Sequence, residues 1–319
     1  MISLNGLSTS KAESLHVKVL ILGAGPAGLS AALYAARADL QPLVLTGLQL
    51  GGQVSLTNTI ENYPGFPEGV GGTELGELFQ RQAERFGARV EFDSAQSVDL
   101  SSRPFKIVAD NGEYIADTLI ISTGANSNLL NIPGEVGLTG RGVSYCATCD
   151  GWFFKDKKVV VVGGGDSALE EGLFLTRFAS SIAIIHRREG LRAGAILQKR
   201  AIENPKIKFI WNTVVTEVVG VDRVESLKIM NLLTGEAGSL LTDGLFIFIG
   251  HTPNTQMFAG QLEMENGYIK VDDRMHTSVQ GVYAAGESAD SHFKQVITSA
   301  GMGAAAAIEA TRFLEQEAG

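Results

Sequence analysis

The only two cysteines of the 319-residue chain, Cys146 and Cys149, have two residues between them, and Asp150 follows directly. Two thiols at this spacing can cycle between a dithiol and a disulfide, and a neighbouring carboxylate can supply or accept the proton that thiolate chemistry requires. Fourteen positions after Cys149, a run of valines ends in the stretch Gly163–Ala168. A dithiol beside a nucleotide-binding turn indicates electron transfer between a nucleotide cofactor and sulfur.

Both features have an alternative interpretation. A CxxC pair can be half of a zinc site, but zinc usually takes four ligands. The chain has no further cysteine and only five scattered histidines, so we expect no metal. Asp150 can also be a turn residue or a helix N-cap instead of an acid–base group.

Composition narrows the class of protein. The formal net charge of −9 disfavours nonspecific binding to nucleic acid or to anionic membranes. Residues 1–16 are polar and predict a disordered lead-in instead of a secretory signal, and no apolar run is long enough to span a bilayer. A CxxC pair in such a chain favours redox work in the cytoplasm, and the length suits two domains.

The first nucleotide-binding turn is the stretch Gly23–Gly28. It follows a predicted strand at 17–22 and precedes a predicted helix at 29–38 and a strand at 42–45. This context favours a pyrophosphate site over a tight turn without ligand. The second strand ends in Thr46-Gly47, where an NAD site usually has an acid, so we do not expect an ordinary NAD site. The loops at 51–53 and 61–65 predict a wall for an extended ligand or, alternatively, plain surface.

A second strand–turn–helix–strand unit follows the cysteines. Its strands are predicted at 158–162 and 182–185, and Gly163–Ala168 opens the helix between them. The second strand ends in His186-Arg187-Arg188, and Arg192 follows. Such a cluster suits a ribose 2′-phosphate and therefore predicts NADPH over NADH, although a solvated basic helix start would look similar.

The two units predict an α/β fold of two Rossmann-like, three-layer domains, the second inserted in the first. We expect residues 1–124 and 251–319 to form the outer domain. Residues 125–250 would form the inserted domain, with both the dithiol and the second glycine turn. His251, in the turn where the chain returns, is expected to be structural.

The sequence resembles the low-molecular-weight thioredoxin reductases over nearly its whole length. The cysteine motif, placed before the second glycine turn and the arginine cluster in this order, is the most specific part. The shared motifs are GAGPAG (23–28), GGQ (51–53), ENYPGF (61–66), STGA (122–125), CATCDG (146–151), GGGDSA (163–168), HRREGLR (186–192), GHTPNT (250–255) and KQVITSAG (294–301).

The resemblance implies a homodimeric flavoprotein with FAD and NADPH as cofactors and thioredoxin or a thioredoxin-like protein as partner. FAD would bind the outer domain and NADPH the inserted one. Cys146 and Cys149 would form the redox-active disulfide, with Asp150 as the acid–base group. Residues implied around FAD are Gly23, Gly25, Pro26, Ala27, Gly28, Thr46, Gly47, Gly51, Gly52, Gln53, Asn62, Thr123, Gly124, Gly286, Glu287, Lys294, Gln295 and Val296. Residues implied around NADPH are Gly163, Gly165, Asp166, Ser167, His186, Arg187, Arg188 and Arg192.

Two positions depart from the family pattern, because Glu287 stands where the family usually has Asp and Lys294 where it usually has Arg. We expect FAD to bind with altered geometry. The alternatives are a related flavoprotein disulfide reductase with ferredoxin or another electron donor, or with a different thioredoxin-like partner. Because the nicotinamide and the disulfide must each come within about 3–3.5 Å of one flavin, the inserted domain is predicted to reorient about 124–126 and 250–253.

Overall fold

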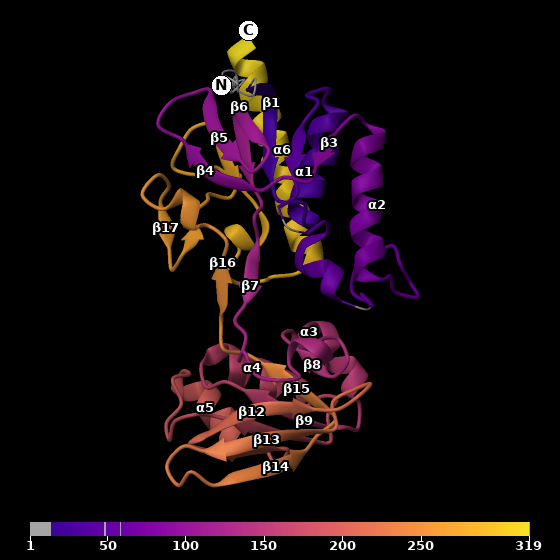
Figure 1. Cartoon of the computed structure of the whole chain (residues 1–319), viewed down its shortest axis with the longest axis vertical. Coiled ribbons are helices and arrows are strands. Elements are labelled where there is room, and N and C mark those ends of the chain that lie inside the picture. Colours follow the sequence, from indigo (N-terminus) through magenta and orange to yellow (C-terminus); the bar gives the residue numbers. More distant parts are fainter. Residues whose placement is uncertain (1–13, 48, 58, 319) are drawn as a thin grey trace, which may run out of the picture. The chain divides into compact units, whose positions relative to one another are not determined.

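The computed structural model describes residues 14–47, 49–57 and 59–318. The predicted lead-in falls mostly on residues 1–13, outside the described residues. Its last two residues belong to strand β1 (Leu15–Leu22), so that prediction is wrong for Leu15 and His16. The chain divides into two compact units (Figure 1). The first unit contains the chain up to Ser55, then Gly71–Ala125, and then the chain from Pro253 onward. The second unit contains Leu56–Val70 and Asn126–Thr252.

The first unit is built on a seven-stranded sheet. Its strands run in the order β3-β2-β1-β6-β5-β4, and β19 also pairs with β6. The first half of β6 pairs antiparallel with β5 and its second half pairs parallel with β19. The bounds are β2 Leu43–Leu45, β3 Arg89–Glu91, β4 Ala95–Asp99, β5 Phe105–Ala109, β6 Gly112–Ile121 and β19 Val282–Ala284.

Strand alternation gives this sheet two apolar faces. Along β1, Leu20 and Leu22 join one buried cluster and Val19 and Ile21 join the other, because successive side chains of a strand point to opposite faces. The second cluster contains the alanines of α1 (Pro26–Arg37) and α6 (Val296–Ala318), so these helices cover that face (Figure 1). Helix α2 (Gly72–Arg85) packs against α1.

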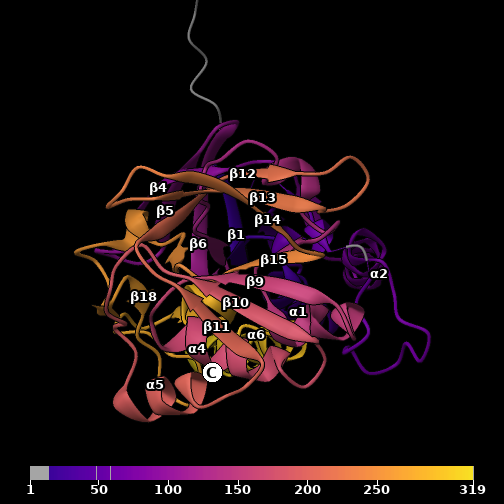
Figure 2. The same cartoon turned by 90° about the horizontal axis from the view of Figure 1, so that it is seen from below.

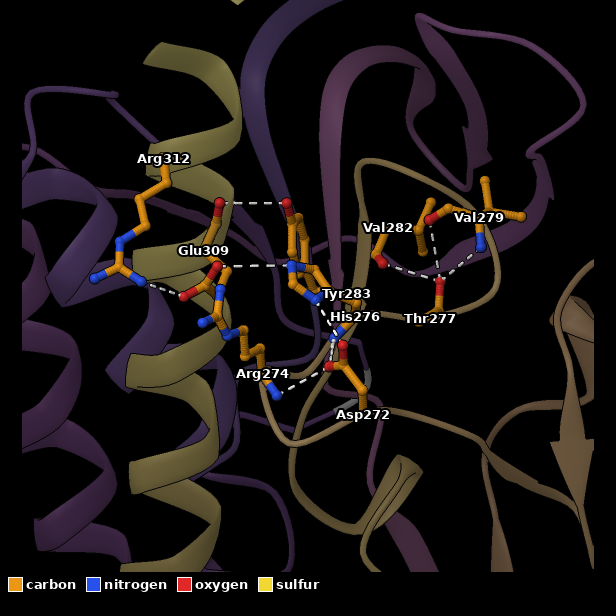
Figure 3. Close-up of polar contacts among 9 residues, drawn as sticks. All are labelled: Asp272, Arg274, His276, Thr277, Val279, Val282, Tyr283, Glu309 and Arg312. Atoms are coloured by element: carbon orange, nitrogen blue, oxygen red, sulfur yellow. Dashed lines mark hydrogen bonds and ion pairs between the residues drawn. The ribbon is translucent and has the colours of Figure 1, made fainter. Parts of the chain in front are cut away.

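Polar contacts hold α6 to the segment before β19 (Figure 3). The carboxylate of Glu309 lies 3.6 Å from His276 Nε2 and accepts a 2.5 Å hydrogen bond from Arg312. His276 Nδ1 lies 2.9 Å from Asp272 Oδ2, and the Tyr283 hydroxyl donates to the Glu309 carbonyl at 3.3 Å. The end of the chain is therefore attached to the sheet of the first unit.

The second unit has a parallel sheet in the order β11-β10-β9-β15-β8, with a three-stranded sheet of β12, β13 and β14 on one side and helices on the other (Figure 2). Val159 and Val161 of β9 face the helix-side cluster, and Val160 and Val162 face the other, again by alternation. The bounds are β8 Val143–Ser144, α3 Ala147–Asp150, β9 Lys158–Val162, α4 Asp166–Leu175, β10 Ser181–Ile185, α5 Ala195–Ile202, β11 Ile207–Ile210, β12 Thr213–Val219, β13 Ser226–Asn231, β14 Ala237–Leu241 and β15 Gly244–Ile247.

The two chain crossings form a short sheet of their own, β7 (Ala125–Ser127) with β16 (His251–Pro253). Asn128 N–H donates to the Gly250 carbonyl at 3.0 Å, and Asn254 N–H donates to the Gly124 carbonyl at 2.9 Å. The prediction that His251 lies in a turn is therefore wrong, because the two crossings satisfy each other's backbone groups and make it a strand residue.

Several elements were not predicted from the sequence, among them β4 and α5. Residues 56–70 belong to the second unit by their contacts, whereas the sequence predicts them in the outer domain. Within the described ranges, no helix is long and apolar enough to cross a membrane.

Candidate active site

The first glycine turn joins β1 to α1 and is shaped by close backbone packing. Gly23 has φ +104°, and a Cβ there would lie 2.3 Å from the Ser122 carbonyl oxygen, so only glycine fits. Gly25 is the N-cap of α1 and offers no side-chain cap to the first turn, in which Pro26 has no N–H. A Cβ at Gly25 would meet nothing within 4 Å, which leaves this side of the turn accessible.

Most residues implied around FAD lie at one edge of the first sheet. Thr46 and Gly47 follow β2, Thr123 and Gly124 follow β6, and Gly286 follows β19. These strands are parallel to β1, so their carboxyl ends share an edge, where open α/β sheets bind ligands. Two contacts bring further segments to the turn: Gly51 N–H donates to Ala24 O at 2.9 Å, and a Cβ at Gly286 would lie 2.9 Å from Ala27 Cβ.

The residues at this edge fit a dinucleotide such as FAD. Uncapped N–H groups at a helix N-terminus suit a pyrophosphate, and the open side of Gly25 leaves space for it. Gln53 lies in η1 (Gly52–Leu56), whereas Asn62 belongs to the segment 56–70, which is grouped with the other unit. Asn62 lines an open hollow of about 340 Å³ formed by residues 61–67.

The departures from the family pattern, Glu287 and Lys294, lie on neighbouring segments of the first unit. Burial raises the pKa of Glu287 to about 7, against the opposing effect of Lys294. Asp290 fixes the loop before α6 by accepting N–H groups of His292, Phe293 and Lys294 at 2.8–2.9 Å. Gln295 directly precedes α6, which begins at Val296.

The second glycine turn joins β9 to α4 and has the same open side. Gly165 is the N-cap of α4 without a side-chain cap, and a Cβ on it would meet nothing within 4 Å. Asp166 begins the helix and accepts the Gly194 N–H at 2.7 Å, while Ser167 is exposed on the first turn. A Cβ at Gly163 would lie 2.5 Å from the Phe248 carbonyl oxygen.

The basic cluster follows β10 and is bonded to this turn. Arg192 N–H donates to the Gly164 carbonyl at 2.7 Å. Arg187, Arg188 and Arg192 are exposed, and within the described part of the chain their guanidinium groups make no ion pair. Exposed guanidinium groups beside an open glycine turn fit the phosphates of NADPH.

His186 is the exception in this cluster because it is buried, with 6% of its surface exposed. Burial lowers the pKa of its imidazole. The ring fills the place that a Cβ of Gly164 would take, since that Cβ would lie 2.3 Å from His186 Nδ1. His186 Nε2 is buried and has no hydrogen-bond partner among the described residues. The imidazole therefore supports the turn from beneath.

The cysteines follow β8 on the same sheet. Cys146 and Cys149 form a disulfide with a Cα–Cα distance of 5.3 Å, and Cys146 Sγ accepts the Cys149 N–H at 3.2 Å. Strand β8 is parallel to β15, which is parallel to β9, so the disulfide and the second glycine turn lie at the same sheet edge.

Asp150 is positioned by a side-chain bond, not by a cap. Its Oδ2 accepts the Ser144 hydroxyl at 2.6 Å, and it makes no side-chain cap bond to η3 (Gly151–Phe154). Burial raises the pKa of Asp150, and the Ser144 hydrogen bond lowers it by a smaller amount. A carboxyl whose pKa is raised in this way can accept or donate a proton more readily than an exposed one.

Sequence reasoning missed two residues that hold this segment. Ser144 ends β8 and contacts Asp150, and its position at the carboxyl end of a parallel strand was a signal that could have identified it. Glu135, fully buried, accepts the Tyr145 hydroxyl at 3.0 Å and the Leu130 N–H at 2.9 Å. Burial and this carboxylate raise the pKa of Tyr145. Both residues before Cys146 are thus anchored.

Comparison with known proteins gives consistent matches. A family described as pyridine nucleotide-disulphide oxidoreductase matches residues 17–303. A thioredoxin reductase of Rickettsia felis is 49% identical over 308 residues, which cover 95% of this chain and 99% of the relative. The crystal structure of thioredoxin reductase from Streptococcus pyogenes is similar at 40% identity and a TM-score of 0.91, covering 95% of this chain and 100% of that one. The thioredoxin reductase from Giardia duodenalis is similar at 40% identity, a TM-score of 0.89 and the same coverage.

Proposed function

The chain belongs to the pyridine nucleotide-disulphide oxidoreductase family and, within it, to the low-molecular-weight thioredoxin reductases, and from this premise we propose its electron path. Electrons pass from NADPH through FAD to the Cys146–Cys149 disulfide and on to a thioredoxin. FAD binds the first unit and NADPH the second. The protein acts as a homodimer in the cytoplasm.

One observation carries this proposal: a disulfide, a half-buried carboxyl and an open glycine turn beside exposed arginines follow strands of one parallel sheet. The arginines favour NADPH as donor over ferredoxin, because a protein donor does not require a 2′-phosphate site. The uncapped turn of the first unit supports FAD. When bound, FAD supplies a group that accepts the hydride of NADPH and returns two electrons to the disulfide.

The chain's own residues perform the sulfur chemistry. Two electrons and one proton open the disulfide to a Cys149 thiolate and a Cys146 thiol. Cys146 then gives its proton to Asp150 and attacks the partner disulfide, so that one partner sulfur leaves as a thiolate and a mixed disulfide forms. Cys149 attacks Cys146, which restores the enzyme disulfide and releases the second partner sulfur. Asp150 returns its proton to the departing thiolate, so electrons and protons balance.

The crossings β7 and β16 serve as the hinge of this cycle. Gly124 (φ +69°) and Gly250 (φ +104°) stand beside the paired strands in the left-handed region that glycine adopts without strain. Because the nicotinamide and the disulfide each need access to one flavin, turnover requires the units to reorient. A cross-link that joins the two units should abolish turnover, and undiminished turnover would contradict the motion.

Anaerobic titration of the purified protein with NADPH and then with NADH tests the function. We expect bound flavin, reduction by NADPH at lower concentration than by NADH, and subsequent reduction of an added thioredoxin. Cys146→Ser and Cys149→Ser should each abolish reduction of thioredoxin and leave reduction of the flavin by NADPH intact. The proposal would be contradicted if either variant still reduced thioredoxin, or if the protein were colourless and took up no FAD. Electron transfer from reduced ferredoxin but not from NADPH would select the alternative donor.

A further inference from the structure

Ser144 lies in the cysteine segment, and the proposed reaction assigns it no role. It is 4% exposed, and it ends β8, two positions before Cys146. Its Oγ lies 2.6 Å from Asp150 Oδ2, 3.2 Å from the Cys146 carbonyl oxygen and 3.1 Å from the Cys146 backbone nitrogen. One buried hydroxyl therefore lies between the attacking cysteine and the carboxyl group.

The direction of each bond follows from the chemistry of a hydroxyl. Ser144 has one proton to donate and can accept on its lone pairs. The backbone N–H of Cys146 is a donor only, so Ser144 accepts it. The proton of Ser144 goes to Asp150 Oδ2, because a hydrogen bond to a carboxylate is shorter and stronger than one to a peptide carbonyl.

We infer that Ser144 is a positioning residue that holds the Asp150 carboxyl beside Cys146 and keeps it available as a carboxylate. The inference rests on the proposed function, since Asp150 matters only if it handles the proton of Cys146. Burial favours the protonated form of Asp150, in which it could not accept a proton from Cys146. Ser144 opposes this effect by donating to the ionised form.

Charged groups on the packed elements do not take over this task. Helix α4, which contacts α3, carries Asp166, Glu170 and Glu171, and Lys155 follows η3. None of these is among the causes that shift the pKa of Asp150, which are burial and Ser144 alone. Strands β8 and β15 carry no charged side chain within their described bounds.

Ser144→Ala in the flavin-loaded, full-length protein tests the inference. Removing the hydroxyl raises the pKa of Asp150, so the acid limb of the kcat/KM profile for thioredoxin should move to higher pH by about one unit. Ser144→Thr keeps the hydroxyl and should restore the profile. Ser180→Ala is the matched control, because Ser180 lies in the same unit and its hydroxyl donates to the Lys157 carbonyl, away from the cysteines.

A double variant separates positioning from general damage. In an Asp150→Asn background, Ser144→Ala should change neither the rate nor the pH profile further, because the group it serves is gone. A second readout does not depend on flavin or nucleotide. The protein is reduced with dithiothreitol and desalted, and the rate at which iodoacetamide alkylates Cys146 is measured as a function of pH. The alkylation profile of Ser144→Ala should also move to higher pH.

The outcomes distinguish the inference from the proposed function. If the unsubstituted protein and Ser180→Ala reduce thioredoxin and Ser144→Ala shifts neither profile, Ser144 has no such role and the function stands. If no variant reduces thioredoxin with NADPH, the proposed function fails, and the alkylation profile still decides whether Ser144 sets the protonation of the site. Equal shifts in Ser144→Ala and Ser180→Ala also overturn the inference.

Discussion

The two glycine turns of this chain share their backbone bonds. In each, the first glycine donates its N–H to the last residue of the second strand. In each, the carbonyl of the next residue accepts an N–H from the segment beyond that strand, so the turn is fixed on two sides. The matching bonds are Gly23 N to Leu45 O (2.8 Å) and Gly163 N to Ile185 O (3.2 Å), then Gly51 N to Ala24 O (2.9 Å) and Arg192 N to Gly164 O (2.7 Å).

The turns differ at two positions, the second residue of the turn and the residue after the second strand. Where one of these side chains is larger, the other is smaller. The first turn has Ala24 at its second position and Thr46 after the strand, both buried. The second has Gly164 and His186 at the same positions, and the imidazole fills the place of the missing Cβ. Close packing accounts for this pair, because a larger side chain on one segment leaves room only for a smaller one on the other.

The segments beyond the second strands also differ in charge. Thr46 and Gly47 are uncharged, whereas Arg187 and Arg188 are exposed cations. Conversely, the first turn has the half-buried carboxyl of Glu287 nearby, since its neighbour Gly286 lies so close to Ala27 of that turn that a Cβ would be 2.9 Å from the alanine Cβ. In the proposed function, the shared backbone holds a dinucleotide in each unit, and we propose that these side chains select which one.

The largest expected effect comes from removing the arginines, which are the charge difference between the two turns. Arg187→Ala/Arg188→Ala should weaken NADPH binding by about 100-fold or more, because each charge-assisted hydrogen bond to a phosphate contributes about 1.5–3 kcal/mol. Binding of NADH, which lacks the 2′-phosphate, should change little. Titration of both nucleotides measures this, with Arg200→Ala on α5 as the control. Equal losses for NADH would show that the cluster does not recognise the 2′-phosphate.

Glu287 should make the first unit sensitive to pH. In the unfolded chain it ionises near 4.5, and in the folded chain its pKa is about 7. As pH rises from 4.5 to 7, the unfolded state releases this proton first, so the free energy of unfolding falls, by at most about 3 kcal/mol. Chemical denaturation of flavin-free protein at several pH values measures this. Glu287→Gln should remove the decline, and an unchanged decline would assign it to another group.

Adding a methyl group at Gly164 should strain the second turn. Gly164→Ala should destabilise the second unit by about 1–3 kcal/mol, because its Cβ meets the His186 ring. Gly164→Ala/His186→Thr recreates the pair of the first turn and should recover most of the loss. The melting temperature of the nucleotide-free protein measures both, and Gly165→Ala, whose Cβ meets nothing, is the control. Equal destabilisation by Gly164→Ala and Gly165→Ala would contradict the compensation.

The smallest effect concerns the attachment of α6, which belongs to the first unit (Figure 3). Glu309→Ala removes its contacts with His276 and Arg312, whose side chains are 40% and 58% exposed. The cost should be about 0.2–1 kcal/mol and should shrink at high salt. Denaturation at two salt concentrations tests this, with Glu315→Ala on the same helix as the control. A larger, salt-independent loss would mean that Glu309 supports the packing of the helix.

The sequence predicted the parts of the fold that depend on neighbouring residues. The strand at Lys158–Val162 and the helices after both glycine turns follow from alternation and from strand–turn–helix order. The paired crossings at β7 and β16 could not be predicted, because their hydrogen bonds join segments more than 120 residues apart. Because this pairing is not visible in the sequence, the sequence pattern predicted His251 to be a turn residue.

By itself, the sequence determined which chemistry the chain carries: the spacing of Cys146 and Cys149, the glycine positions and the arginines are local patterns, and local sterics and charge give them meaning. Tertiary structure alone decided which atoms meet. Ser144 reaches Asp150 because helix α3 turns the chain back toward the end of β8, and His186 supports Gly164 because two strands are adjacent in a sheet. Such contacts depend on the volume and direction of side chains brought together by folding, which no spacing along the chain specifies.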